Sequence, residues 1–254
     1  MLSSDKFVAL FLSDVHLQES APRTTEAFIK FLQQQGRQTQ QLYLLGDLFE
    51  YWAGDDDLNS PFNARIVAAL RSLSDEGVAL FWIAGNRDFL IGQCFAEAAK
   101  LTLLPDPSVI KVANKSIVIA HGDAQCTDDV DYQAFRSQVR MSAWQTAFLS
   151  KPLSERLAII ENMRKQSHAA QQEKTQQIMD VNLDAITELF NLTHADILIH
   201  GHTHRPASHE MRVKGNDVMR YVLTDWDFDN HSVRGGGIAI HDNGEIRLLP
   251  ATIF

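Results

Sequence analysis

The segment FVALFLSDVH, residues 7–16, shows the pattern that recurs along the rest of the chain. Its apolar run, residues 7–12, stops abruptly at Ser-Asp-Val-His. Short apolar runs that end in polar residues are typical of strands buried on both faces. Asp14 and His16 stand two positions apart, and on an extended backbone side chains at that spacing project to the same side. The segment therefore predicts a buried strand with two potential metal ligands at its carboxyl end.

Four further apolar runs end in the same manner. They are residues 41–45 before Gly46-Asp47, 78–84 before Gly85-Asn86, 116–120 before His121-Gly122-Asp123, and 196–199 before His200-Gly201-His202-Thr203-His204. Helical patterns at residues 24–35 and 63–75 separate the early runs. Such alternation is typical of an α/β layered fold. Ligands of these folds bind beyond the carboxyl ends of the strands, so we expect the polar clusters to converge on one site.

The polar clusters offer a mixed set of oxygen and nitrogen ligands. The candidates are Asp14, His16, Asp47, Asn86, His121, His202 and His204. Mixed ligands of this kind suit manganese, iron or zinc better than calcium. Two such cations about 3.5–4 Å apart can clamp a phosphate and lower the pKa of a bridging water. Each motif alone is common in unrelated proteins, and it is their ordered recurrence at strand ends that predicts a dinuclear centre for cleaving phosphorus–oxygen bonds.

Composition places the chain among soluble globular proteins. It has 254 residues, of which 45% are hydrophobic and 22% are charged, and its net charge is −9. Because the overall field repels nucleic acid, we expect no nucleic-acid partner. The two cysteines, Cys94 and Cys126, are expected to be reduced. The chain shows neither a signal-peptide pattern nor an apolar stretch of ~20 residues, so we expect no signal peptide and no transmembrane segment.

The stretch from about residue 129 to 180 differs from its surroundings. It contains no strand-like run, and its apolar residues recur at helical spacing. We predict a helical lid insertion here, within a single domain that spans residues 1–254. Strand-like patterns return afterwards at residues 219–223, 237–241 and 245–249.

The order of the motifs resembles that of the calcineurin-like metallophosphoesterases. The matching motifs are Asp14-x-His16, Gly46-Asp47, Gly85-Asn86, His121-Gly122 and Gly201-His202-x-His204. The resemblance implies an α/β fold, a two-sheet sandwich flanked by helices, with a dinuclear metal site at its rim. One metal would be held by Asp14, His16, Asp47 and His204. The other would be held by Asp47, Asn86, His121 and His202.

Longer blocks resemble the members of this family that act on a UDP-linked diacylglucosamine lipid in lipid A biosynthesis. The blocks are Gly46-Asp47-Leu48-Phe49-Glu50, Gly85-Asn86-Arg87-Asp88-Phe89-Leu90-Ile91-Gly92, Cys126-Thr127-Asp128-Asp129 and His200-Gly201-His202-Thr203-His204-Arg205-Pro206. The resemblance implies that metal-activated water attacks the α-phosphate, which gives UMP and 2,3-diacylglucosamine 1-phosphate. The implied cofactors are two divalent metal ions, of which Mn2+ is the ion expected by resemblance.

The same resemblance implies which residues act on the substrate. The catalytic residues would be Asn86, Arg87 and His121. The substrate contacts would be Asn86, Arg87, Asp129, Ser167, Gln171, Lys174 and His202. Gln171 stands where the family usually has asparagine, so its contact is open. Arg87 stands where most of the wider family has histidine, and arginine holds phosphate oxygens but donates no proton at neutral pH. This substitution favours a phosphate leaving group.

A substrate with two acyl chains needs apolar surface beside the polar site. The resemblance therefore implies a peripheral protein at the cytoplasmic face of the inner membrane. Candidates to line an apolar groove are Phe89, Leu90, Tyr132, Phe135, Val139, Trp144 and Phe148. The same side chains are equally compatible with simple packing of the insertion onto the core.

Two alternatives stay open at this point. Another calcineurin-like phosphodiesterase, or a nucleotide pyrophosphatase acting on a soluble nucleotide, would not need the aromatic-rich insertion. A non-catalytic protein-binding platform would be expected to have lost ligands, whereas every ligand position is filled here.

Several polar residues near the motifs have expected roles other than metal binding. His200 is expected to be a buried structural histidine, and the acidic run at residues 55–57 is expected to be solvated. Asp88 and Asp123 are candidates to orient neighbouring site residues, as carboxylates beside metal ligands commonly do.

Overall fold

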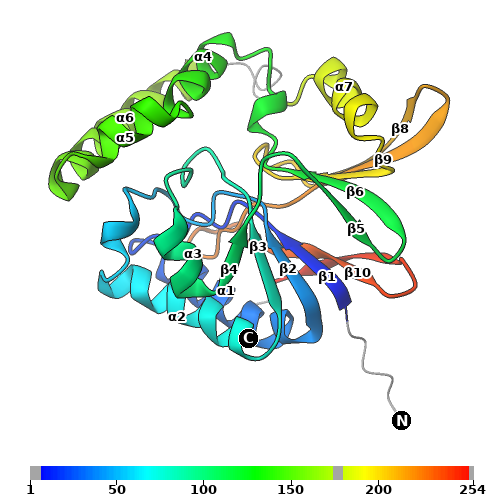
Figure 1. Ribbon diagram of the computed structural model, residues 1–254, viewed down its shortest axis with the longest axis horizontal. Helices are drawn as coiled ribbons and strands as arrows, with labels where there is room; N and C mark the ends of the chain where they lie inside the picture. The colour runs from blue at the N-terminus through cyan, green and yellow to red at the C-terminus, as the bar shows by residue number, and fades with distance from the viewer. Residues whose placement is uncertain (1–6, 174–179, 252–254) are drawn as a thin grey trace.

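The computed structural model describes residues 7–173 and 180–251. Figure 1 shows two β-sheets facing each other, with helices outside them. The first sheet has the order β11-β10-β1-β2-β3-β4 and consists of β1 (Phe7–Leu12), β2 (Thr39–Leu44), β3 (Ala79–Trp82), β4 (Leu101–Leu103), β10 (Gly236–His241) and β11 (Ile246–Pro250). The second has the order β5-β6-β7-β9-β8 and consists of β5 (Ser108–Val112), β6 (Lys115–Ala120), β7 (Ile197–His200), β8 (Ala207–Val213) and β9 (Asn216–Val222).

Helices lie outside the two sheets, and some of them cover the outer sheet faces. They are α1 (Pro22–Gln34), α2 (Pro61–Asp75), α3 (Gln93–Ala99), α4 (Val130–Val139), α5 (Ser142–Leu149), α6 (Leu153–Glu173) and α7 (Leu183–Thr193). In Figure 1, α1 to α3 lie beside the first sheet, α7 lies beside the second, and α4 to α6 lie together away from α7. No helix within the described ranges is long and apolar enough to cross a bilayer.

Three apolar layers hold these elements together. The middle layer lies between the sheets, where the ring of Tyr43 stacks between Phe11 and Phe81 at centroid distances of 5.0 and 4.8 Å. A second layer joins α1 to α3 to the first sheet, and a third joins α7 to the second sheet. Full burial of each large side chain stabilises the fold by about 1.5–3 kcal/mol, so the layers fix the sheets firmly against each other.

The strands that the apolar runs predicted are present, and the expected two-sheet α/β sandwich is confirmed. The five runs form β1, β2, β3, β6 and β7. Strands β1, β2 and β3 are parallel to one another, as are β6 and β7, while the antiparallel strands lie toward the edges of the sheets. Because parallel strands end at the same edge, each sheet brings its polar clusters to one place. Cys94 is exposed, Cys126 is buried, and no disulfide joins them.

The stretch predicted to be helical contains α4, α5 and α6, so its helical character is confirmed from residue 130 to 173. Residues 174–179 of the predicted insertion lie outside the described residues. Its role as a lid stays a prediction. We refer below to residues 130–173 as the helical segment.

A buried arginine fastens the helical segment to the loop that follows β2. The side chain of Arg156 on α6 is 2% exposed. It donates to the carbonyl of Ala53, to the carboxylate of Asp56 and, at 3.0 Å, to the carbonyl of Lys151. A charged group this deeply buried is tolerated only when its donors are satisfied, so this contact fixes where α6 lies.

The acidic run at residues 55–57 takes part in the fold, and the expectation that it is simply solvated is wrong. Asp55 accepts hydrogen bonds from Trp52 Nε1 at 2.9 Å and, near the start of α3, from Gly92 N at 3.0 Å and Phe95 N at 2.9 Å. Carboxylates at helix N-termini satisfy otherwise unpaired amides, so Asp55 stabilises α3.

Replacing Arg156 by methionine should lower the free energy of unfolding by about 1–3 kcal/mol, because the buried carbonyl of Ala53 loses its donor. Urea unfolding followed by circular dichroism measures the change. Arg37→Met is the matched control, since Arg37 pairs with Glu76 at the surface and should cost less than about 1 kcal/mol. Equal losses in the two variants would contradict the role assigned to Arg156.

Candidate metal centre

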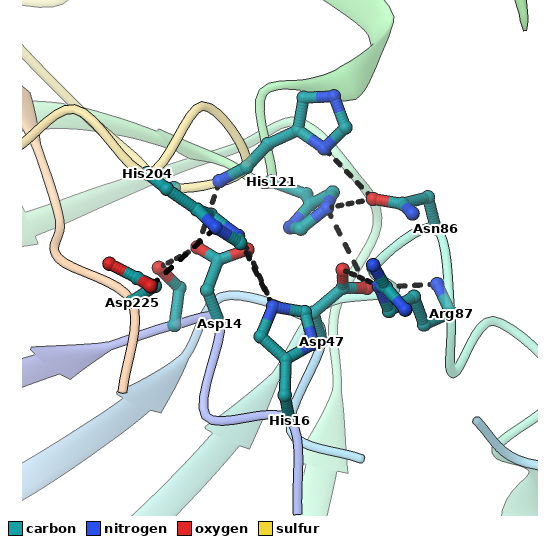
Figure 2. A network of polar contacts seen from close by, with 12 residues as sticks. Asp14, His16, Asp47, Asn86, Arg87, His121, His204 and Asp225 are labelled. Atoms are coloured by element: carbon teal, nitrogen blue, oxygen red, sulfur yellow. Dashed lines mark hydrogen bonds and ion pairs between the residues drawn. The ribbon is translucent and has the colours of Figure 1, made fainter. Parts of the chain in front are cut away.

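The seven ligand candidates lie together where the strand ends of the two sheets meet. Figure 2 shows side chains from the loops after β1, β2, β3, β6 and β7 pointing toward one another. They form two groups, and the carboxylate of Asp14 lies near candidate ligand atoms of both. The sequence motifs therefore converge as expected.

The first group contains Asp14, His16 and His204. The Nε2 atoms of the two histidines are 3.2 Å apart, and Asp14 Oδ1 lies 3.4 Å from that of His204 and 4.0 Å from that of His16. Asp14 Oδ2 accepts from Ser13 Oγ at 2.5 Å and from His202 N at 2.8 Å, whereas Oδ1 is buried without a hydrogen-bond partner. A buried carboxylate oxygen without a donor, facing two imidazole nitrogens, fits a bound cation.

The second group is arranged around Asn86. Its Oδ1 lies 2.8 Å from His121 Nε2 and 2.8 Å from His202 Nδ1. His121 Nδ1 lies 2.8 Å from the carbonyl of Leu45, which accepts its proton, so the neutral ring keeps a lone pair on Nε2. Asp47 Oδ1 lies 3.7 Å from that Nε2 atom. Three acceptors facing one point fit a second cation, and the carboxylates of Asp14 and Asp47 both lie near His121 in this group.

The electrostatics of the site favour positive charge. Burial lowers the pKa of His121, but the carboxylates of Asp47 and Asp14 outweigh it and raise that pKa to about 9. Burial and the nearby His121 lower the pKa of His202 to about 4. The pKa of Asp14 lies well below its usual range, because the surrounding histidines outweigh burial, which acts in the opposite direction. A cation bound here would meet ionised carboxylates, and it would take the place of the proton that His121 otherwise carries on Nε2.

The ligands are held in a strained backbone conformation. Asp14, His16, Asp47, His202 and His204 have φ between 52° and 68°, in the left-handed region. Ten non-glycine residues have positive φ in the described part of the chain, and half of them are these ligand candidates. Such a conformation costs about 1–3 kcal/mol per residue and clusters at functional sites. The site is therefore rigidly formed at the expense of stability.

Two glycines let the loops approach closely. A Cβ atom on Gly85 would lie 2.2 Å from the amide of Asp47, and one on Gly201 would lie 2.1 Å from Asp14 Oδ2. Only glycine fits at these contacts, so the glycines that precede Asn86 and His202 are explained by packing.

Asp88 orients the loop that carries Asp47. It is fully buried, and its Oδ1 accepts from Asp47 N at 3.2 Å and Gly85 N at 3.0 Å while Oδ2 accepts from Leu48 N at 2.8 Å. Burial and the charge of Asp47 raise the pKa of Asp88 to about 6. The structure gives Asp88 the orienting position that the sequence suggested.

Arg87 lies at the open side of the site. Its amide donates to Asp47 Oδ1 at 2.8 Å, and its Nε atom lies 3.6 Å from Asp47 Oδ2. The side chain is 30% exposed and also contacts Glu50. A guanidinium group in this place can bind an anion that approaches from solvent.

Asp123, a candidate to orient a neighbouring site residue, attaches the helical segment to the site. Its Oδ2 accepts from Tyr132 Oη at 2.6 Å and Arg136 Nε at 2.8 Å, both on α4. The ring of Tyr132 lies 6.0 Å from that of His202, at an interplanar angle of 27°. The start of α4 is therefore fixed directly beside the ligand candidates.

The predicted substrate contacts outside the motifs are only partly described. Asp129 caps α4 by accepting from Tyr132 N at 3.1 Å. Ser167 and Gln171 lie on α6, but their side chains are outside the described part, and Lys174 lies outside the described residues altogether. The structure thus neither supports nor excludes these three contacts.

The candidate groove residues divide between packing and exposure. Leu90, Val139 and Phe148 are buried, so for them the packing alternative is correct. Trp144 stacks on Phe148 at 4.9 Å and contacts Phe89 at 6.2 Å. Phe135 is 38% exposed. Much of the expected groove lining therefore packs the helical segment against the core.

His200 is structural, as the sequence suggested. It is fully buried, its Nδ1 lies 2.9 Å from the carbonyl of Gly201, and its Nε2 lies 3.3 Å from Arg220 Nη1. Burial is the main reason that its pKa is lowered to about 4, which keeps the ring neutral.

Two acidic residues at the site were not predicted. Asp225 Oδ2 lies 3.7 Å from His204 Nδ1, and Arg234 holds that carboxylate with donors at 2.8 and 3.1 Å. Glu50 contacts His16 and Arg87. Asp225 follows the end of β9, and Glu50 follows the end of β2. Their positions after strand ends are the feature of the sequence that could have identified them as site residues.

Comparison with known proteins agrees with this geometry. The family model for calcineurin-like phosphoesterases matches residues 7–206. The chain is 50% identical to the UDP-2,3-diacylglucosamine hydrolase of Aromatoleum aromaticum over 90% of this chain and 93% of that one. It is 43% identical to the Salmonella typhi protein of the same name over 95% and 98% of the two chains. A solved archaeal phosphodiesterase covers 95% of this chain and 98% of its own at 14% identity, with a TM-score of 0.44, too low to bear on function.

The family model thus covers every strand-end motif that supplies a candidate ligand. This chain belongs to the calcineurin-like phosphoesterase family.

Proposed function

We propose that this protein hydrolyses the pyrophosphate bond of UDP-2,3-diacylglucosamine, giving UMP and 2,3-diacylglucosamine 1-phosphate in lipid A biosynthesis. The observation that carries the proposal is the complete set of ligand candidates in a chain that matches hydrolases of this name along nearly its whole length. A metal-dependent hydrolase of phosphorus bonds is the activity that this family and these donors support.

The donor set fits two divalent cations. Asp14, His16, Asp47 and His204 would hold one, and Asp47, Asn86, His121 and His202 would hold the other. Bound cations would polarise the pyrophosphate and lower the pKa of a water at the α-phosphate. The buried oxygen of Asp14 that lacks a donor supports a bound cation. Mn2+ is the ion we propose, because the resemblance implies it and mixed imidazole and oxygen ligands are compatible with it.

The chain's own residues bind and orient the substrate. We propose that the guanidinium of Arg87 holds an oxygen of the pyrophosphate, and its position beside Asp47 and its partial exposure support this. Arginine does not release its proton at neutral pH, so Arg87 cannot protonate the leaving group. The reaction therefore requires a leaving group that departs without protonation, and a sugar phosphate meets this requirement. We propose substrate contacts at Asn86, Arg87, Asp129, Ser167, Gln171, Lys174 and His202, with Asn86, Arg87 and His121 as the catalytic residues.

The helical segment is proposed as a lid that meets the membrane surface and the acyl chains. Exposed apolar side chains on α4 and α5 support this proposal, and they are Val130, Phe135 and Leu149, together with Met141 between the two helices. Apolar surface in water is unfavourable and commonly marks a binding face. We therefore propose a peripheral protein at the cytoplasmic face of the inner membrane.

Hydrolysis of the UDP-lipid in 18O-labelled water should place the label in UMP, because the attack is at the α-phosphorus. Phosphorus NMR detects the isotope shift on the product. Label in the sugar phosphate would contradict the proposed attack. Comparable hydrolysis of a soluble nucleotide sugar or dinucleotide under the same conditions would favour the alternative of a soluble substrate.

Asn86→Ala and His121→Ala should each remove a ligand of the second cation and lower turnover by more than about a hundredfold. Bound manganese, measured by inductively coupled plasma mass spectrometry, should fall from two ions per chain toward one. His231→Ala is the matched control, because this exposed histidine lies outside the motifs and should change neither quantity. Near-normal turnover in either ligand variant would rule out the second site as assigned.

Arg87→Ala should lower kcat about tenfold to a thousandfold, the range for loss of one charge-stabilising donor. Steady-state kinetics on the UDP-lipid, with manganese content measured in parallel, separates this effect from loss of metal. Arg87→Lys keeps the charge but not the paired donors, so it should recover only part of the rate. Unchanged kinetics in the alanine variant would remove Arg87 from the proposed mechanism.

A further inference from the structure

Glu50 lies where three separate parts of the chain meet beside the metal centre. It follows β2 by a few residues, and its side chain is 12% exposed. Its Oε2 lies 3.2 Å from His16 Nδ1, while its Oε1 lies 2.5 Å from Arg87 Nη1 and 2.7 Å from Arg164 Nη2. These partners come from the loop after β1, the loop after β3 and helix α6. Neither cluster of candidate ligands includes Glu50.

The two guanidinium groups share a single carboxylate oxygen. Arg87 and Arg164 would repel each other at this spacing if Glu50 were neutral. The ring of Tyr51 lies 5.5 Å from the guanidinium carbon of Arg164 and supports it from another side. The carboxylate is therefore what allows both cations to stand at the open side of the site.

Glu50 also acts on the ring of His16. The Nε2 atom of that ring faces Asp14 and His204, and its Nδ1 atom faces Glu50. The Nδ1 atom is at hydrogen-bond distance from the carboxylate, although it is not aligned for a hydrogen bond. A carboxylate beside one ring nitrogen favours the proton there and leaves the other nitrogen as a ligand. His16 is thereby directed toward the first group of candidate ligands.

We infer that Glu50 is a positioning residue of this site, which directs the His16 ring toward the cation and holds Arg87 beside Arg164 of the helical segment. The inference rests on the proposed function, because it presupposes a cation at His16 and a phosphate group near Arg87. It assigns to one side chain both the orientation of a metal ligand and the fixation of α6 at the site. The alternative is that Glu50 only attaches α6 to the core, and for that role the contact between Glu50 and Arg164 would be sufficient.

Glu50→Gln in the full-length protein tests the inference, because glutamine keeps the size of the side chain and removes its charge. We expect the dissociation constant for Mn2+ to rise about tenfold to a hundredfold, and kcat on the UDP-lipid to fall by a similar factor. Calorimetric titration of the metal-free protein with MnCl2 measures the first quantity independently of activity. The thermal midpoint of the metal-free protein should fall by only a few degrees, because the contacts of Arg156 and of Asp123 still hold the helical segment.

Two matched variants separate positioning from docking. Arg164→Gln removes only the contact with α6, so it should leave Mn2+ affinity unchanged. Glu161→Gln removes an exposed pair with Lys165 on the same helix and should change nothing. Wild-type Mn2+ affinity in Glu50→Gln, or the same loss in Arg164→Gln, would overturn the inference. A wild-type protein that binds Mn2+ and cleaves the UDP-lipid keeps the proposed function in either case, whereas one that does neither overturns both.

Discussion

The arrangement of this molecule depends on one constraint, which is that ligands from two sheets must meet within a few ångströms at the ends of their strands. Five of these residues reach the site only by adopting a left-handed backbone. Gly85 and Gly201 permit the contact between loops, and the buried carboxylate of Asp88 fixes the Asp47 turn. The strain of about 1–3 kcal/mol per residue is offset by the apolar layers on both sides of each sheet.

The electrostatic state of the site follows from the same constraint. Ionised carboxylates and imidazole lone pairs that converge at one point repel one another unless positive charge lies between them. The chain as a whole has a net charge of −9, so it attracts an anionic substrate only through a local cationic region. Arg87 and Arg164 extend that region outward. The carboxylate of Glu50 pairs with both guanidinium groups and so offsets their mutual repulsion. Bound cations would therefore act together with these arginines.

Much of the fold and of the candidate site could be predicted from sequence because the deciding signals are local. An apolar run that stops at a polar cluster identifies a strand and its end, and parallel strands bring such ends together. Contacts between distant segments carry no such signal. Asp56 belongs to an acidic run that the sequence alone predicts to be solvated, yet it pairs with Arg156. Asp123 stands close to His121 in sequence, but its carboxylate contacts α4. The choice among possible partners is made by packing in three dimensions.

Ion pairs join the helical segment to the rest of the molecule, with the arginine of each pair on the segment and the carboxylate outside it. Arginines on the segment meet carboxylates that belong to the strand-end loops, as in the pair of Arg136 with Asp123. Such a boundary limits how the segment can be exchanged between relatives by recombination. A chimera that received foreign helices without the matching acidic loops would bury unmatched charge at several points at once. Helices and loops are therefore expected to be inherited as a set, although they lie far apart in the chain.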